Sequence, residues 1–206
     1  MNAQEAQNIK WSENIITVDG DYIDHVAFDL IVNFERMLNR RIPAADFSQW
    51  AVNIALDGRL KPGNHETQVV LLHDKQNPKL ENFAPADYVK ELNGQAFKDP
   101  QLGEFIINAI ATDDEVAEKD NVLLDLLKTV LSHEEVKRIM LVPNAEDSHL
   151  MSTLRSTLRN ADDELKHITL FAMQPLEGGN FKQQILGYSL LNAMGISSSE
   201  IEQKIK

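Results

Sequence analysis

The clearest hydrophobic pattern in the chain is a helical one. Apolar side chains recur three or four residues apart at Ile23, Val26, Ala27, Leu30, Ile31, Phe34, Met37 and Leu38. This spacing places them on one face of an amphipathic helix over residues 23–38. A short apolar run at residues 15–18 stands just before this helix and predicts a buried strand. The first predicted unit is therefore a strand that leads into a long helix.

The same plan recurs along the rest of the chain. Further strands are predicted at residues 67–74, 104–111, 138–142 and 168–173, and further helices at residues 122–131, 150–158 and 181–194. After the first, longer gap, strand starts recur at intervals of roughly 30 to 36 residues, as consecutive strand–helix units require. Connections of this length favour parallel pairing with helices on both faces. We therefore expect one α/β domain over residues 1–206, a three-layer αβα sandwich with a mostly parallel sheet of about five strands.

Three segments fit this plan less directly. Residues 47–56 carry both a helical and an alternating pattern; Asp46 as a cap and Gly58 as a stop favour the helix, and a strand remains the alternative. Residues 75–103 contain several breakers and predict a short helix opened by Pro85, in either a lid or a long connection. We expect a flexible tail at residues 1–13 and a short helix at residues 196–206.

Acidic residues follow one predicted strand after another. They are Asp19, Asp21, Asp74, Asp113, Asp114, Glu146, Asp147 and Glu177. In a parallel sheet these positions share one edge, and ligands bind at that edge near the point where strand order reverses. Converging carboxylates require protonation or a hard cation, and Mg²⁺ or Mn²⁺ prefers oxygen ligands. Helix capping is the alternative; it accounts for Asp21 and Asp24 as a capping box and for Asp147, but leaves Asp19 without an explanation.

Composition narrows the classes of protein. The 206 residues are 43% hydrophobic and 25% charged, as in ordinary globular proteins. No cysteine is present, which excludes disulfides, cysteine-based zinc sites and thiol nucleophiles. The formal net charge of -12 opposes general binding to nucleic acid and anionic lipid. With no signal-like start and no apolar run of about 20 residues, we expect a cytoplasmic protein with no membrane partner.

Most standard sequence motifs are absent. The chain has no G-x-G-x-x-G turn, no phosphate-binding lysine loop and no nucleophile elbow. The six histidines show no metal-binding spacing, and only His73, beside Asp74 at a strand end, has a suggestive position. Gly178 and Gly179 precede a predicted helix whose N–H groups could hold the anionic group of a small molecule, with Asn180 as a simple N-cap as the alternative. Local basic positions include Arg155 and Arg159.

Several of these features together resemble a known arrangement. They are the residues 18–21 after the first strand, two helices before the second strand, Lys119 and Asp120 with Asp125 on a helix, and a strand at residues 140–142 leading to Glu146 and Asp147. Over residues 14–173 this pattern resembles PIN/NYN-type nuclease domains, which have a Rossmann-like sheet. The acid after the fourth strand is displaced relative to the family turn.

The resemblance implies a divalent-metal site that acts on RNA phosphodiesters. Carried over, Asp19, Asp120 or Asp125, and Asp147 are the metal ligands for Mg²⁺ or Mn²⁺, with Asp19 and Asp147 catalytic. Such a site could be active, as a metal-dependent ribonuclease-like hydrolase with RNA as partner, or vestigial. The alternative function is a non-enzymatic interaction module that forms a homo-oligomer through residues 23–38. Other stretches, including residues 92–97 and 176–181, resemble an uncharacterised bacterial protein family, which implies a shared fold and no activity.

Overall fold

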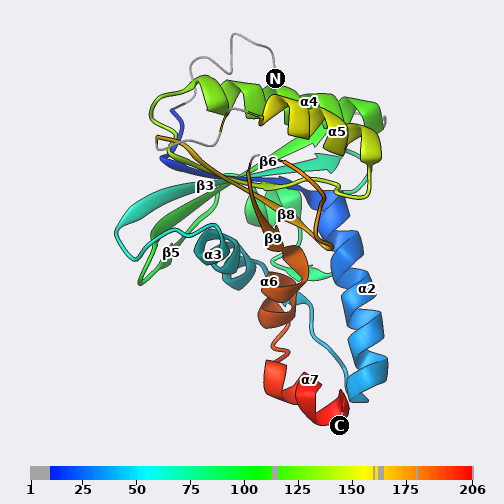
Figure 1. Cartoon of the computed structure of the whole chain (residues 1–206). Helices are drawn as coiled ribbons and strands as arrows, with labels where there is room; N and C mark the ends of the chain where they lie inside the picture. Colours follow the sequence, from blue (N-terminus) through cyan, green and yellow to red (C-terminus); the bar gives the residue numbers. More distant parts are fainter. Residues whose placement is uncertain (1–9, 113–115, 160, 162–164, 180, 206) are drawn as a thin grey trace.

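The centre of the molecule is a seven-stranded sheet in the order β5-β6-β3-β1-β7-β8-β9 (Figure 1). The computed structural model describes residues 10–112, 116–159, 161, 165–179 and 181–205. The strands are β1 (Asn14–Asp19), β3 (His65–Asp74), β5 (Ala96–Asp99), β6 (Gly103–Thr112), β7 (Arg138–Val142), β8 (His167–Ala172) and β9 (Lys182–Ile185). Every neighbouring pair is parallel except β5 with β6. The predicted α/β class with a mostly parallel sheet is therefore confirmed.

Strand β1 lies between β3 and β7 and is buried along its whole length. Thr17 pairs with Val70 of β3 on one side and with Leu141 of β7 on the other. The chain moves outward from β1 through β3 to β6, and then returns to add β7 and β8 on the opposite side. Strand order thus reverses between β1 and β7, so a crevice is expected at the carboxyl ends of these two strands.

Helices cover both faces of the sheet (Figure 1). One buried cluster joins the sheet to α2 (Gly20–Leu38), α3 (Phe47–Asp57) and α6 (Leu186–Ala193). The other joins it to α4 (Val116–Ser132) and α5 (Ser148–Thr157). Along β1, Ile16 and Val18 belong to the first cluster and Ile15 to the second. Because side chains alternate along a strand, Asp19 lies on the same face of the sheet as Ile15, which is the face that α4 covers.

The helix predicted at residues 47–56 is confirmed as α3. Asp46 accepts a hydrogen bond from Gln49 N at 2.9 Å, as the predicted cap should. At the other end, Gly58 has φ −71° and the left-handed conformation falls on Arg59, with φ 64°. A Cβ on Gly58 would lie 2.6 Å from the side chain of Met140. The glycine therefore permits close packing of α3 on β7, and does not supply the left-handed turn.

Two edge strands raise the count from the five expected to seven. Strand β5 pairs antiparallel with β6, and Phe97 stacks on Phe105 with ring centroids 4.8 Å apart. Strand β9 occupies residues that carried a helical pattern, so the helix predicted at residues 181–194 begins only at Leu186. Pairing with the open edge of β8 satisfies the backbone of residues 182–185, and this contact cannot be read from local periodicity.

The connection between β3 and β5 is packed against the body of the protein. Strand β4 (Phe83–Ala84) pairs with β2 (Ala45–Asp46), and Leu80 and Leu92 are fully buried. A π-helical turn, η1 (Tyr88–Leu92), is capped by Asp87. The short helix predicted in this segment is therefore present, but it begins at Tyr88 and not at Pro85 as predicted.

The two ends of the described chain are held differently. Trp11 is buried, and the Ser12 hydroxyl donates to Glu66 at 2.7 Å. Residues 1–9 of the predicted tail lie outside the described residues. The predicted C-terminal helix is α7 (Ser198–Ile205), which lies beside the far end of α2 (Figure 1). There Arg40 binds Glu200 through two hydrogen bonds of 2.6 and 3.0 Å. No helix in the described part of the chain is long and apolar enough to cross a membrane.

Substitution of Gly103 tests the start of β6. Gly103 has φ +93°, and a Cβ there would collide with the backbone of His65, its partner in β3. We expect Gly103→Ala to lower the free energy of unfolding by more than about 2 kcal/mol, since positive φ alone costs roughly 1–2 kcal/mol. Gly94→Ala is the matched control, because Gly94 has φ +73° but open space around it. Urea unfolding that shows equal losses for the two variants would contradict this packing.

Candidate functional site

Asp19 ends β1 and begins α2. Its carboxylate accepts a hydrogen bond from Tyr22 N at 3.0 Å, so Asp19 is the N-cap of α2. The side chain is almost wholly buried. The helix starts at Gly20, directly after the strand and one turn earlier than the apolar pattern predicts. Capping therefore explains the one acidic residue for which the sequence offered no structural role.

The predicted capping box of Asp21 and Asp24 is wrong, because both carboxylates hold the connection after β3. Asp21 accepts from Asp74 N and from the Asn77 side chain, each at 2.9 Å. Asp24 accepts from the backbone N–H groups of Glu81 and Asn82, at 3.1 and 2.8 Å. The first turns of α2 thus fix a loop that would otherwise expose four unpaired donors.

The ammonium group of Lys119 lies between the first two of these acids. Lys119 Nζ is 2.8 Å from Asp19 Oδ1 and 2.7 Å from Asp21 Oδ2. Lys119 belongs to the first turn of α4 and is only 13% exposed. A cation in the first turn opposes the helix dipole, so its position there requires compensation from elsewhere. The two carboxylates from the β1–α2 junction supply it.

The charges at this junction alter one another. Burial raises the pKa of Asp19, and the nearby Lys119 ammonium opposes that effect. Burial also disfavours the charged form of Lys119, but Asp19 and Asp21 outweigh it, so the pKa of Lys119 is raised. Tyr22 follows on the same helix, where burial and then the negative charges of Glu146 and Asp19 raise its pKa to about 12. The lysine therefore stays charged at neutral pH.

Two further predicted ligands lie close to this junction. Burial raises the pKa of Asp120, and repulsion from Asp147 and Asp19 adds to the effect. Asp147 is the N-cap of α5 and accepts from His149 N and Leu150 N at 2.8 and 2.9 Å. The structure thus brings Asp19, Asp120 and Asp147 to the carboxyl edge between β1 and β7.

Other predicted positions lie elsewhere. Asp125 is on the exposed side of α4, with its side chain 77% exposed and paired to Lys128 at 3.1 Å. Glu177 is exposed on the connection after β8. Asp113 and Asp114 lie outside the described residues. Asp125 therefore does not share a site with the other three predicted metal ligands.

The donor set does not match a ready-made divalent-metal site. Mg²⁺ and Mn²⁺ need several oxygen ligands around one point, at about 2.0–2.6 Å. Among the described residues, no three acidic or histidine side chains are grouped closely enough to hold a metal ion. The Lys119 ammonium also occupies the space between Asp19 and Asp21 and would repel a second cation. The carboxylates of this junction are neutralised from within the chain.

His73 is a structural residue at the end of β3. Its Nδ1 lies 2.9 Å from Asp74 O and 3.1 Å from Asn77 O, contacts that require the proton on Nδ1. The imidazole stacks on Tyr88, with ring centroids 3.8 Å apart. Both side chains are buried. The histidine thus supports the connection after β3, and the pair with Asp74 that the sequence suggested is a backbone contact.

A cavity of ≈680 Å³ opens beside the junction. Its lining includes Asp21, Asp24, Asn77 and Tyr88. The two carboxylates already accept the hydrogen bonds from the connection that covers them. The cavity therefore borders the site without offering it a free charged group.

Lys119 is the residue that the sequence did not identify as the charge partner of Asp19. The two lie 100 positions apart, and only the packing of α4 on β1 joins them. A lysine in a first helical turn is electrostatically unfavourable unless an acid lies nearby. The sequence did not offer this signal, because the helix is predicted at residues 122–131, whereas α4 begins at Val116.

Removal of the ammonium group tests this arrangement. We expect Lys119→Met to lower the free energy of unfolding at pH 7 by about 3 kcal/mol, because it leaves a buried carboxylate without its partner. Lys128→Met is the matched control in the same helix; its pair with Asp125 is exposed and should cost less than about 1 kcal/mol. Urea unfolding of both variants measures the difference, and equal losses would contradict a stabilising role of the Lys119 ammonium group.

The loss in Lys119→Met should also depend on pH. Burial raises the pKa of Asp19, so its carboxyl is neutralised earlier on acidification in the folded than in the unfolded protein. A raised pKa of an acid adds stability as pH falls, and this effect is larger without the opposing lysine. The deficit of the variant should therefore shrink between pH 7 and pH 5. A constant deficit over that range would contradict a charged, buried Asp19.

Comparisons with known proteins identify a family and no activity. A family model described as a family of unknown function, DUF6621, matches residues 8–201. A search of curated proteins found no match. A search of solved structures also found none. Because the matched segment includes every strand and nearly all of the helical residues described above, the chain belongs to the DUF6621 family of unknown function.

Proposed function

We propose that this protein is a PIN/NYN-like domain with a vestigial, non-hydrolytic acidic centre, and that it acts by binding a partner. The observation that carries the proposal is the position of Lys119 Nζ, within 2.8 Å of Asp19 and 2.7 Å of Asp21. In an active centre of the kind that the resemblance implies, a divalent cation would balance these carboxylates. In this protein the ammonium group of Lys119 balances them instead.

The strand order supports the PIN/NYN-like part of the proposal. The run β6-β3-β1-β7-β8 is parallel throughout, and Asp19 stands where the order reverses. Asp120 and Asp147 border the same point. The arrangement therefore retains acidic groups at the edge where an α/β sheet binds ligands, while the lysine supplies their positive partner.

A permanent internal cation changes what the site can do. A bound metal ion could activate water and stabilise charge on a phosphoryl group. The Lys119 ammonium group gives two of its three N–H groups to the carboxylates, and its raised pKa keeps it from acting as a base at neutral pH. The site thus favours structural stability over hydrolysis of RNA.

Manganese binding tests the proposal. The test uses about 1 mM MnCl₂, on the order of 100 times the Kd of a site that binds Mn²⁺ at about 10 μM. We expect this concentration to leave the melting temperature of the natural protein unchanged. Lys119→Ser should gain stability with Mn²⁺, up to about 2.7 kcal/mol at 100 Kd, because its carboxylates then lack a cation. Differential scanning calorimetry with and without Mn²⁺ measures both effects, and Mg²⁺ serves as a second probe.

The double variant Lys119→Ser with Asp19→Asn is the control, and it should lose the response to Mn²⁺. Stabilisation of the natural protein by Mn²⁺, if absent in Asp19→Asn, would overturn the proposal and favour an active centre. Cleavage of single-stranded RNA that needs Mn²⁺ and Asp19 would do the same. No response in Lys119→Ser would show that the lysine does not replace a metal ion.

Self-association through α2 is a second candidate, favoured by the exposure of this helix. Phe28 is 51% exposed, and Ile31 and Phe34 are only partly buried although α2 is one of the longest helices described. The helix runs well beyond the sheet in Figure 1. A second copy packed along this face would cover apolar surface that the monomer leaves in water.

Light scattering tests this second function. We expect the natural chain to have the mass of a dimer at micromolar concentration and Phe28→Glu to have that of a monomer, because a charge cannot be buried without a partner. Leu165→Glu is the matched control, since Leu165 is 76% exposed and lies on the opposite face of the sheet. A monomeric natural protein, or equal loss of mass in both variants, would contradict association through α2.

A further inference from the structure

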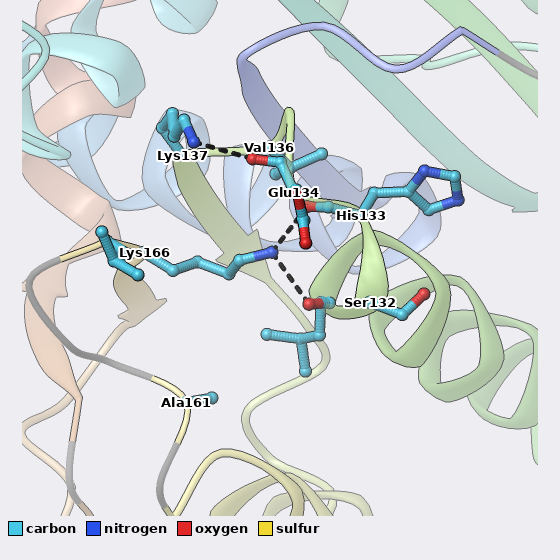
Figure 2. Close-up of a pocket in the computed structure, with 9 residues that line it drawn as sticks. Ser132, His133, Glu134, Val136, Lys137, Ala161 and Lys166 are labelled. Atoms are coloured by element: carbon cyan, nitrogen blue, oxygen red, sulfur yellow. Dashed lines mark hydrogen bonds between the residues drawn. The ribbon is translucent and has the colours of Figure 1, made fainter.

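Three of the cavities away from the acidic junction have basic side chains in their linings, and in the smallest, of ≈260 Å³, Lys98 lies with Glu66 and Glu104. In the first of the other two, the basic group already has partners. This cavity of ≈520 Å³ lies at the end of α4, with Lys166 in its lining. Figure 2 shows the Lys166 ammonium directed at the carbonyl groups that end the helix. Its Nζ lies 2.8 Å from both Leu131 O and His133 O. The lysine thus caps the helix and is not available to a ligand.

The second cavity, of ≈460 Å³, lies along the outer face of α5. Its lining consists of Ser152, Arg155, Ser156, Arg159 and Gly179. The four α5 residues are spaced three and four apart along the helix and its C-terminal end, so they share one face. The buried residues of the helix, Leu150 and Leu154, lie on the other side, in the core. The described lining contains two guanidinium and two hydroxyl groups, and no carboxylate.

Arg155 is the group in this cavity that lacks a partner. Its guanidinium forms no hydrogen bond or ion pair with any described residue, and Arg155 Nε is buried without an acceptor. Only Nε is buried, so the terminal nitrogens are the part of the guanidinium that a ligand in the cavity can contact. An anion there would accept hydrogen bonds from these nitrogens and balance the charge of Arg155.

The opposite wall of the cavity is held in a fixed position. Gln183 of β9 donates to Leu176 O and Gly178 O, each at 3.1 Å, and accepts from Leu176 N at 3.0 Å. Gly178 and Gly179 have φ +72° and +103°, which residues with a side chain rarely adopt. The hydrogen bonds of Gln183 therefore fix the shape of the loop that faces α5, and Gly179 contributes only backbone atoms to the lining of the cavity.

The chemistry of the lining selects the ligand. Guanidinium and hydroxyl groups are donors that match the several oxygens of a phosphate group, and arginine binds phosphate in a bidentate manner. The molecule as a whole has a net charge of -12, so a general field does not draw anions to it. An anion that binds here must be recognised by the local groups. The volume exceeds that of a free phosphate ion and leaves space for an attached organic group.

We propose that the cavity between α5 and the β8–β9 connection is a binding site for the phosphate group of a small phosphorylated molecule, with Arg155 as its principal contact. This site is independent of the junction at Asp19 and Lys119, which lies at the β1–α2 end of the sheet. The anion site predicted at a helix N-terminus after Gly178 and Gly179 is wrong, because strand β9 follows these glycines and the helix begins only at Leu186. The proposed site uses the side chains of α5 instead.

Titration of the full-length protein with adenosine 5′-monophosphate and with inorganic phosphate tests the site. The buffer contains about 150 mM NaCl, which screens general attraction beyond about 8 Å. We expect saturable shifts of the Gly179 and Ser156 amide signals in ¹H–¹⁵N spectra. Arg155→Gln should weaken binding about tenfold or more, because one charge-assisted contact is lost. Tighter binding of the nucleotide identifies an organic phosphate, and equal binding identifies free phosphate.

Arg36→Gln is the matched control, because Arg36 is an exposed arginine on α2, far along the chain from α5. It should bind both probes like the natural protein. Ser152→Asp is a second variant that places a carboxylate in the cavity, and it should abolish binding. Unsaturable shifts, unchanged affinity in Arg155→Gln and Ser152→Asp, or equal loss in Arg36→Gln would overturn the proposal. Spectra of each variant without ligand establish that it is folded.

Discussion

At the end of the central strand β1, the Lys119 ammonium group balances the carboxylates of Asp19 and Asp21. Asp19 must face α4 because of strand alternation, and it must also cap α2 because the helix begins at the next residue. Lys119 meets it from α4, on the opposite face of the sheet from α2. The ion pair therefore joins helices from both faces at the end of β1. Asp21 extends the link to the connection after β3.

Much of this fold follows from patterns along the chain. Continuous apolar runs predict strands that are buried on both faces, and five of the seven strands in the sheet lie where such runs occur. The long amphipathic pattern predicts α2, and the Asp46 cap separates helix from strand for α3. These elements depend on local periodicity and capping, which neighbouring residues determine. The regular spacing of the units then requires parallel pairing.

The remaining features depend on contacts between distant residues. Strand β9 exists because β8 offers it an edge, although its own residues carry a helical pattern. The sequence predicts Asp21 as the cap of α2, but Asp19 is the cap and Asp21 binds the connection after β3, because the start of α2 could not be placed to within one turn. Asp147 could be placed at the carboxyl edge because it follows a predicted strand, whereas Asp120 entered only through the resemblance to PIN/NYN-type domains. To place Asp125 required the rotation of α4, which packing determines. Lys119 required knowledge of which helix covers β1.

The two edges of the sheet carry a further consequence. Both β5 and β9 are four residues long, and β5 alternates exposed with half-buried positions and includes Lys98. A short edge strand with a charged side chain is a poor template for the backbone of another molecule. The central strands, with their long apolar runs, would be efficient templates if they were exposed. The short edge strands thus prevent the long apolar strands of the interior from pairing with strands of other molecules.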